Sequence, residues 1–240
     1  MKSLGTRHLF WGLWAAGLLL LVTISCARVT GRLTRFVEVA LFLGVWFGFI
    51  ALLWRRRVLR CVGLAATTIV AAFLLLPSWH RPDPALLRED YVAALRHYEG
   101  VTYCWGGEGV RGIDCSGLVR RGMVDAAFRR GVRTCDPDLV RRALFLWWHD
   151  CAAWGLGWQQ AGLTTYVRDT SSINALDHSG VLPGDLAVTL GGDHVMAYLG
   201  SNLWIQADPR AGSVTTTAVP SEDNTQFRRP MRIVRWSVLQ

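Results

Sequence analysis

Three long stretches with almost no charge in the first 80 residues limit what this chain can fold into more than any other feature. They cover residues 9–27, 36–54 and 61–79, each 19 residues long, and Glu38 is the one acid within them. A helix of about 20 apolar residues crosses the hydrocarbon core of a bilayer. Because short arginine-rich loops separate the three stretches, we expect residues 1–80 to form a membrane anchor of about three transmembrane helices.

The formal net charge of +8 is distributed unevenly along the chain. Residues 1–83 hold ten lysines and arginines against two acids, whereas residues 84–240 hold sixteen arginines against sixteen acids. Positive charge collects in the loops beside membrane spans, and a nucleic-acid site on the soluble part would need net positive charge there. We therefore expect a lipid bilayer as a partner and no nucleic acid. The sequence names no protein partner.

The basic residues of the loops predict how the anchor is oriented. With the N-terminus in the cytoplasm, the inner set is Lys2, Arg7, Arg55, Arg56, Arg57 and Arg60, and the outer set is Arg28, Arg32 and Arg35. Cytoplasmic loops usually carry the excess of lysine and arginine, so we expect residues 81–240 to lie outside the cytoplasm. Cleavage of the first span as a signal peptide is the alternative, and it leaves the domain on the same side.

Composition changes after the third stretch. The segment "PSWHRPDP" (77–84) holds three prolines, which favour a linker. In the soluble domain that follows, helical periodicity comes first and short β-branched or aromatic runs separated by turns come later. The helical segments are 85–100, 115–130 and 136–155, and the runs are 185–190, 194–200, 203–208, 213–219 and 231–239. Helices followed by an antiparallel sheet predict an α+β domain.

The segment "GIDCSGLV" (112–119) carries the clearest chemical signal of this domain. Cys115 stands where a loop turns into a helix, so the positive end of the helix dipole would lower the pKa of its thiol. Backbone N–H groups at the same helix terminus would bind an oxyanion. These features favour a nucleophile, and the alternative is a packed thiol that acts as a small hydrophobe.

A thiol nucleophile needs a base and, in a triad, a group that orients the base. His194 opens a predicted strand directly after "GGD" and is the candidate base. Gln206 lies on the next predicted strand, and a hairpin turn at Ser201 and Asn202 would bring the two side chains together on one face. Asp208 is a less well aligned candidate for the orienting group.

Five ordered segments resemble the NlpC/P60 family, papain-like cysteine peptidases that cut bacterial cell-wall peptides. The segments are "YCWGG" (103–107), "GIDCSGLV" (112–119), "LPGDLAV" (182–188), "HVMAYLG" (194–200) and "WIQADP" (204–209). The resemblance runs from about Arg88 to about Val238. It implies a papain-like fold for residues 81–240, with N-terminal helices packed on an antiparallel β-sheet.

The resemblance also implies roles for individual residues. Cys115 would be the nucleophile, and His194 the general base that later acts as the acid. Gln206 would take the third, orienting place, where the family more often has histidine. Tyr103 would reach over the thiol and help to hold the oxyanion or the substrate.

Two residues beside the nucleophile, Asp114 and Ser116, would contact the amino end of the peptide substrate. The implied substrate is a peptidoglycan stem peptide, cleaved at the γ-D-glutamyl–diamino acid bond. Such a protein would lie in the bacterial cytoplasmic (inner) membrane as a multi-pass protein, with its catalytic domain facing the periplasm or exterior. No metal or organic cofactor is implied, and the sequence has no CxxC or HExxH motif.

Two features depart from the family pattern. Residues 131–181 form an insertion rich in tryptophan between the nucleophile helix and "LPGD", and the anchor has several spans. They keep two alternatives open: an acyltransferase acting on a lipid or membrane substrate, and a non-catalytic cell-wall-binding module. Outside the cytoplasm two of Cys104, Cys135 and Cys151 could form a disulfide, although their spacing does not say which two.

Overall fold

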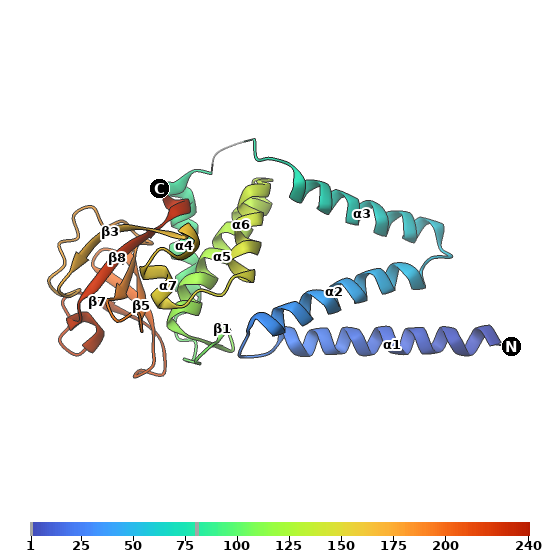
Figure 1. Ribbon diagram of the computed structural model, residues 1–240, viewed down its shortest axis with the longest axis horizontal. Helices are drawn as coiled ribbons and strands as arrows, with labels where there is room; N and C mark the ends of the chain where they lie inside the picture. The colour runs from blue at the N-terminus through green and yellow to red at the C-terminus, as the bar shows by residue number, and fades with distance from the viewer. Residues whose placement is uncertain (1, 80–81) are drawn as a thin grey trace. The chain divides into compact units, whose positions relative to one another are not determined.

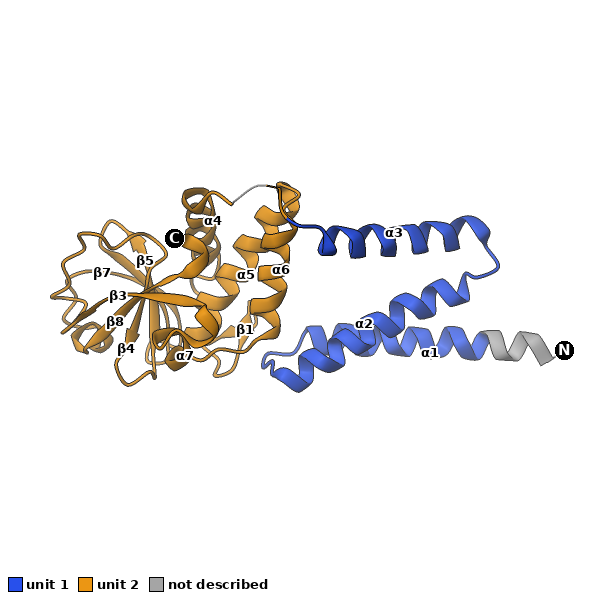
Figure 2. Ribbon diagram, turned by 45° about the horizontal axis from the view of Figure 1, so that its top comes forward, with its two compact units in different colours: residues 1–77 blue, residues 78–240 orange. Residues whose placement is uncertain are grey.

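The computed structural model describes residues 2–79 and 82–240. The chain divides into two compact units, residues 1–77 and 78–240, which are coloured separately in Figure 2. The boundary that we expected between residues 80 and 81 lies outside the described residues.

Among its described residues the first unit contains three long helices, α1 (Lys2–Ser25), α2 (Arg32–Leu52) and α3 (Arg57–Leu75) (Figure 1). Each contains a segment that is long and apolar enough to cross a membrane. Helix α3 begins and ends four residues before the expected span at 61–79, because Pro77 prevents the helix from continuing. The expectation of three long apolar helices is confirmed.

Polar groups within these helices find partners on neighbouring helices. The Ser25 hydroxyl donates to the Glu38 carboxylate at 2.5 Å, which gives the single acid of the three stretches a partner. The Trp14 indole N–H donates to the carbonyl oxygen of Val45 at 2.8 Å. The Trp46 indole donates to the Thr67 hydroxyl of α3 at 2.9 Å. Such pairing lowers the cost of polar groups in an apolar environment.

The second unit is an α+β domain, as the sequence predicts (Figure 1). Its helices are α4 (Pro84–His97), α5 (Cys115–Arg133), α6 (Pro137–Trp148) and the short α7 (Ala153–Gly157). Within the described residues a six-stranded antiparallel sheet has the order β3-β8-β4-β5-β6-β7. The strands are β3 (Thr164–Thr170), β4 (Leu186–Thr189), β5 (Val195–Gly200), β6 (Leu203–Asp208), β7 (Ser213–Ala218) and β8 (Met231–Trp236). Strands β1 (Glu108–Gly109) and β2 (Gly112–Ile113) form a small separate ribbon.

Both faces of the central strands are buried. Alternate residues of a strand point to opposite faces, and each face carries its own apolar cluster. On β5, Val195 and Ala197 join the cluster that includes Leu118 of α5. Met196 and Tyr198 belong to a second cluster on the other face, which the segments around residues 171–181 and 225–228 cover. Helix α5 therefore packs directly on the central strands.

The region 131–181 differs from our expectation in two ways. The expected helix at 136–155 is interrupted after Trp148, where His149 adopts an extended backbone, and α7 follows as a separate turn. Asp136 caps the first part, since its side chain accepts from the backbone N–H groups of Asp138 and Leu139. The later part contributes strand β3, which pairs with β8 and forms one edge of the sheet.

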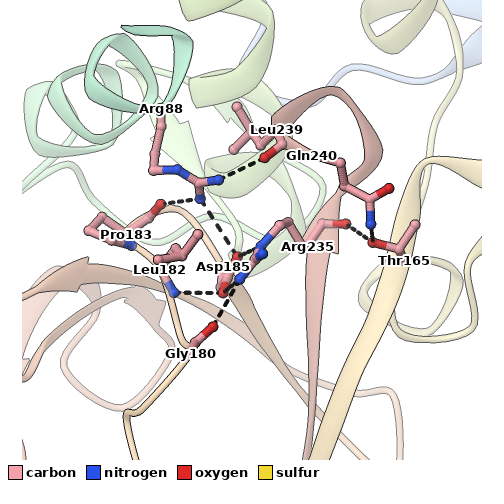
Figure 3. Close-up of polar contacts among 9 residues, drawn as sticks. All are labelled: Arg88, Thr165, Gly180, Leu182, Pro183, Asp185, Arg235, Leu239 and Gln240. Carbon is pink, nitrogen blue, oxygen red and sulfur yellow. Dashed lines mark hydrogen bonds and ion pairs between the residues drawn. The ribbon is translucent and has the colours of Figure 1, made fainter. Parts of the chain in front are cut away.

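A buried ion-pair cluster explains the aspartate of "LPGD" (Figure 3). Asp185 is fully buried, and Arg235 of β8 donates to its two carboxylate oxygens at 2.7 Å each. Arg88 of α4 lies 3.8 Å from the same carboxylate. Arg88 also donates to the carbonyl oxygens of Pro183 and Leu239, at 2.8 and 2.7 Å. The cluster thus ties α4, the turn before β4 and the C-terminal segment together.

Candidate active site

Helix α5 begins where the sequence predicts, at Cys115, the candidate nucleophile. Asp114 is its N-cap, and one carboxylate oxygen accepts from the Gly117 N–H at 2.6 Å and from the Ser116 hydroxyl at 3.0 Å. The other oxygen accepts from the Gly106 N–H at 2.8 Å. Asp114 therefore joins the glycine-rich loop, residues 101–112, to the start of the helix. This structural task stands beside the substrate contact that the resemblance implies for Asp114 and Ser116.

Two glycines permit this close approach. A Cβ atom at Gly117 would collide with the carbonyl oxygen of Gly107, and a Cβ atom at Gly107 would collide with the carbonyl oxygen of Gly112. The "YCWGG" and "GIDCSGLV" segments are therefore held together backbone to backbone. A further hydrogen bond, from the Asp114 N–H to the Gly107 carbonyl at 3.0 Å, fixes their register.

The Cys115 thiol is 7% exposed. Backbone N–H groups of Val195, Ser116 and Cys115 itself point at its sulfur and favour the thiolate. Burial, and then the charge of Asp114, outweigh them and raise the pKa of the thiol to about 11. The lowered pKa that the helix terminus suggests is therefore not found. The resting group is a neutral thiol with oriented N–H donors around it.

The His194 ring is buried and contacts Gln206 as predicted. The ring Nε2 lies 2.6 Å from Oε1 of Gln206. Because an amide oxygen only accepts, Nε2 carries the proton and Nδ1 is left as the basic nitrogen. Burial lowers the pKa of His194, partly opposed by the hydrogen bond to Gln206. The imidazole is therefore neutral at neutral pH.

The β5–β6 hairpin brings the two side chains together. Ala197 pairs with Ile205, and Ser201 and Asn202 turn the chain with positive φ angles. Asp208 contributes only a weaker electrostatic effect on His194. Gln206, which is 1% exposed, is therefore the residue that orients the ring.

The Cys115 thiol and strand β5, which begins directly after His194, meet at Val195. The backbone N–H of Val195, the residue after His194, faces the Cys115 sulfur. Tyr103 belongs to the same site: its pKa is raised to about 12 by burial, with smaller contributions from Cys115 and Asp114. Its phenol stays protonated at neutral pH and can donate a hydrogen bond.

Arg120 is a buried residue of this region that the sequence analysis did not select. It is 2% exposed and lies five residues after Cys115 on α5. Its guanidinium pairs with Glu108 of the glycine-rich loop and with Asp150, which follows α6. The charges were visible in the sequence, but nothing local indicates a pairing across thirty residues.

The insertion also contacts the turn before His194. A Cβ atom at Gly192, which has a φ of +70°, would lie 2.7 Å from Cδ1 of Trp154. In the same turn, Arg229 donates to both carboxylate oxygens of Asp193, at 2.8 and 2.9 Å. Trp154 and this ion pair hold the turn that begins β5.

Neither a metal centre nor a disulfide is found among the described residues. No group of three or more histidine, cysteine, aspartate or glutamate side chains there could hold a metal ion. Within the same part of the chain, Cys104, Cys135 and Cys151 are free thiols.

The chain belongs to the NlpC/P60 family. The family's sequence profile matches residues 100–230, more than half of the chain and including the thiol, the histidine and the glutamine just described. Membership confirms the resemblance drawn from the five segments and places the chain in a family of cysteine hydrolases. A comparison with curated proteins gave no match.

Several solved structures are similar to this chain. NlpC1 from Trichomonas vaginalis is 18% identical over 66% of this chain and 46% of its own length, with a TM-score of 0.42. The peptidoglycan hydrolase RipB from Mycobacterium tuberculosis is 22% identical over 65% and 67%, with a TM-score of 0.40. The P60 domain of an antigen from M. avium subspecies paratuberculosis is 18% identical over 65% and 98%, with a TM-score of 0.36. The chain covers about half of NlpC1 and of NlpC2 from T. vaginalis, 46% and 50%.

Proposed function

We propose that this chain is a membrane-anchored cysteine hydrolase of peptidoglycan stem peptides, with Cys115, His194 and Gln206 as its catalytic triad. The observation that carries the proposal is the 2.6 Å contact between His194 and Gln206, one residue from the N–H that faces the Cys115 sulfur. The N–H that faces the sulfur belongs to the residue directly after His194, and an oriented imidazole is the base that a thiol nucleophile requires.

The proposed reaction starts from a neutral thiol and a neutral imidazole. As the sulfur attacks the scissile carbonyl carbon, the thiol proton moves to Nδ1 of His194, and an S–C bond forms. Collapse of the tetrahedral intermediate breaks the C–N bond, and His194 returns the proton to the leaving amine. Water then attacks the thioester with His194 as base, which releases the acid and restores the thiol.

The developing oxyanion would be held by donors that already surround the sulfur. The N–H groups of Cys115 and Ser116 lie at the start of α5, where the helix dipole adds to their effect. The Tyr103 phenol, which stays protonated because its pKa is raised to about 12, is a third donor. Gln206 keeps the proton of His194 on Nε2, so that Nδ1 is always the atom that moves a proton.

The substrate and the location are part of the same proposal. The cleaved bond is the γ-D-glutamyl–diamino acid link, as the family resemblance implies. In this proposal the three apolar helices, which are long enough to cross a membrane, anchor the chain in the cytoplasmic membrane. The distribution of basic residues in the loops supports a catalytic domain on the outer side.

The test is mass spectrometry of defined muropeptides incubated with the full-length chain in lipid discs. We expect release of fragments that end in D-glutamate and begin with the diamino acid. Cys115→Ala abolishes this release, whereas Cys61→Ala, a matched thiol variant on α3, keeps the wild-type rate. Cleavage by Cys115→Ala at the wild-type rate would contradict the triad. A folded wild type that cleaves nothing while Cys115 alkylates would favour acyl transfer instead.

A further inference from the structure

A cavity of about 500 Å³ lies on the second unit between helices α5 and α6, residues 161–163 and the C-terminal residues 236–238. Its walls are mostly apolar and include Met123 and Ala127 of α5, Leu146 of α6, Leu163 and Val238. Sites for small organic ligands usually have volumes of roughly 300–1,000 Å³. The cavity is therefore large enough for an organic ligand or part of one.

This cavity is separate from the candidate active site. Cys115 is the first residue of α5, and Met123 and Ala127 follow it by eight and twelve residues. At 1.5 Å per residue, they lie about 12 and about 18 Å further along the helix. A group bound in the cavity therefore has no direct access to the thiol, and the proposed reaction gives the cavity no role.

Charged residues line one side of the cavity. Arg141 and Arg142 of α6 contribute two positive charges, and Asp138, which pairs with Arg141, contributes one negative charge. Arg142 is exposed. Two guanidinium groups against one carboxylate favour an anionic group beside an apolar one, and guanidinium is well suited to phosphate.

The outer face of α6 continues the apolar surface of the cavity. Leu144, Phe145 and Trp148 are 42%, 42% and 41% exposed, and their spacing puts them on one face of the helix. Phe145 also lines the cavity. An exposed apolar face next to arginines, with a tryptophan at its end, is typical of a helix that lies at a membrane surface.

The length of the tether favours lipid as the occupant. Helix α3 ends at Leu75 and α4 begins at Pro84, so eight residues connect them. Fully extended, eight residues reach at most about 29 Å. If α3 spans the membrane, the catalytic domain stays within that distance of the lipid headgroups, where an anionic lipid is present at high local concentration.

We propose that the cavity and the exposed face of α6 bind an anionic phospholipid of the same membrane. One acyl chain occupies the apolar cavity, and the phosphate contacts Arg141 and Arg142. The inference rests on the proposed membrane anchorage. It assigns the tryptophan-rich insertion a task, holding the catalytic domain on the membrane surface.

The test uses the full-length chain in lipid discs with a photoreactive benzoylphenylalanine in place of Phe145. Discs contain either phosphatidylcholine alone or phosphatidylcholine with phosphatidylglycerol. We expect lipid adducts at this position to increase severalfold with phosphatidylglycerol. Arg142→Gln and Arg141→Gln should each reduce the adducts roughly fivefold, the effect of one basic residue at an anionic surface. The matched control carries the same photoreactive group in place of Tyr166, which is 52% exposed on β3, and should give few adducts.

Three other outcomes are distinguishable, and each would overturn the lipid site, the last of them together with the membrane anchorage. Equal adducts in the two lipid compositions, or equal adducts at positions 145 and 166, would overturn the lipid site while leaving the anchor in place. Adducts to a second copy of the chain instead of lipid would assign the α6 face to self-association and overturn it as well. A chain that does not remain in the discs would contradict the membrane anchorage, and the lipid site with it.

Discussion

The two units of this chain differ in the side chains that they expose and bury. In the first unit, Leu33 and Leu75 are 77% and 84% exposed. In the second unit, Asp185, His194 and Gln206 are buried, with at most 3% of their surface exposed. Each arrangement is costly in water for an isolated protein, and each has its own physical explanation.

The difference shows where each unit finds compensation. Apolar exposure on helices of about twenty residues costs little when lipid replaces water around them. Buried polar groups are stable only when other protein groups form hydrogen bonds or ion pairs with them. In the second unit Asp185 has such a partner in a structural ion pair with Arg235. His194 has one in Gln206, within the candidate site. Substitutions in either unit test this difference.

The largest effect is expected at the thiol. Cys115→Ala removes the nucleophile, and we expect kcat/KM for the stem peptide to fall by a factor on the order of 10⁴. The kcat/KM of His194→Ala should fall by a similar factor. The kcat/KM of the double variant should fall no further, because the two residues act as one unit. The measurement is steady-state kinetics in lipid discs, with folding checked by near-ultraviolet circular dichroism. A double variant whose loss equals the product of the single losses would show that the two act independently.

The second effect is on stability and compares the two acids Asp185 and Glu38. Asp185→Asn leaves Arg235 without its charge partner, and we expect the domain to lose about 3–5 kcal/mol of unfolding free energy. Glu38→Gln keeps an acceptor for the Ser25 hydroxyl and should change stability by less than about 0.5 kcal/mol. Hydrogen exchange of β4 and β8 measures the loss of stability in Asp185→Asn. Thermal unfolding of the whole chain measures the change in Glu38→Gln. Equal effects at the two positions would contradict the distinction between the units.

Much of this arrangement could be predicted from the sequence because its signals are local. The three long helices follow from length and composition, and the cap at Asp114 follows from the residues next to Cys115. The contact of His194 with Gln206 follows from one hairpin turn.

Other features depend on contacts between distant parts of the chain. Strand β3 exists because it pairs with β8, about seventy residues later. The end of α6 at Trp148 goes with the pairing of Asp150 with Arg120, which is equally non-local. The raised pKa of Cys115 comes mainly from burial by the assembled sheet, which no short segment reveals. The sequence correctly predicts Cys115 at the start of a helix, which by itself would lower the pKa of the thiol. Burial in the folded domain raises that pKa instead.

The third prediction concerns Gln206 as a positioning residue. Gln206→Ala leaves the His194 Nε2 proton buried without a partner, and we expect a loss of roughly 10- to 100-fold in kcat with little change in KM. Gln206→Glu tests the role more sharply, since a carboxylate beside the imidazole favours its protonated form. The acid limb of the kcat/KM profile should therefore move to higher pH in Gln206→Glu. An unchanged limb would mean that Gln206 only fills space.

The last prediction is a pH dependence, and its effect at neutral pH is small. Because the folded thiol has a pKa of about 11, above the ordinary value of 9.0, alkylation of Cys115 by iodoacetamide should be slow at neutral pH. It should accelerate about tenfold per pH unit until near pH 11. By linkage, the raised pKa stabilises the fold fully below pH 9, and this contribution is lost as the pH rises through 11. Peptide mapping of the alkylated chain gives the rate. An inflection of the alkylation rate below pH 7 would contradict the raised pKa and support the thiolate expected from the helix terminus.

We propose that buried Cys115 forms a covalent bond to its substrate with His194 as the base. The most direct measurement is intact-mass spectrometry of the full-length chain, quenched in acid within milliseconds of mixing with a defined stem peptide. We expect an added mass equal to the acyl half of the peptide, mapped to Cys115, in the wild type and not in His194→Ala. Product formation without any adduct on Cys115, or an adduct on a different residue, would contradict it.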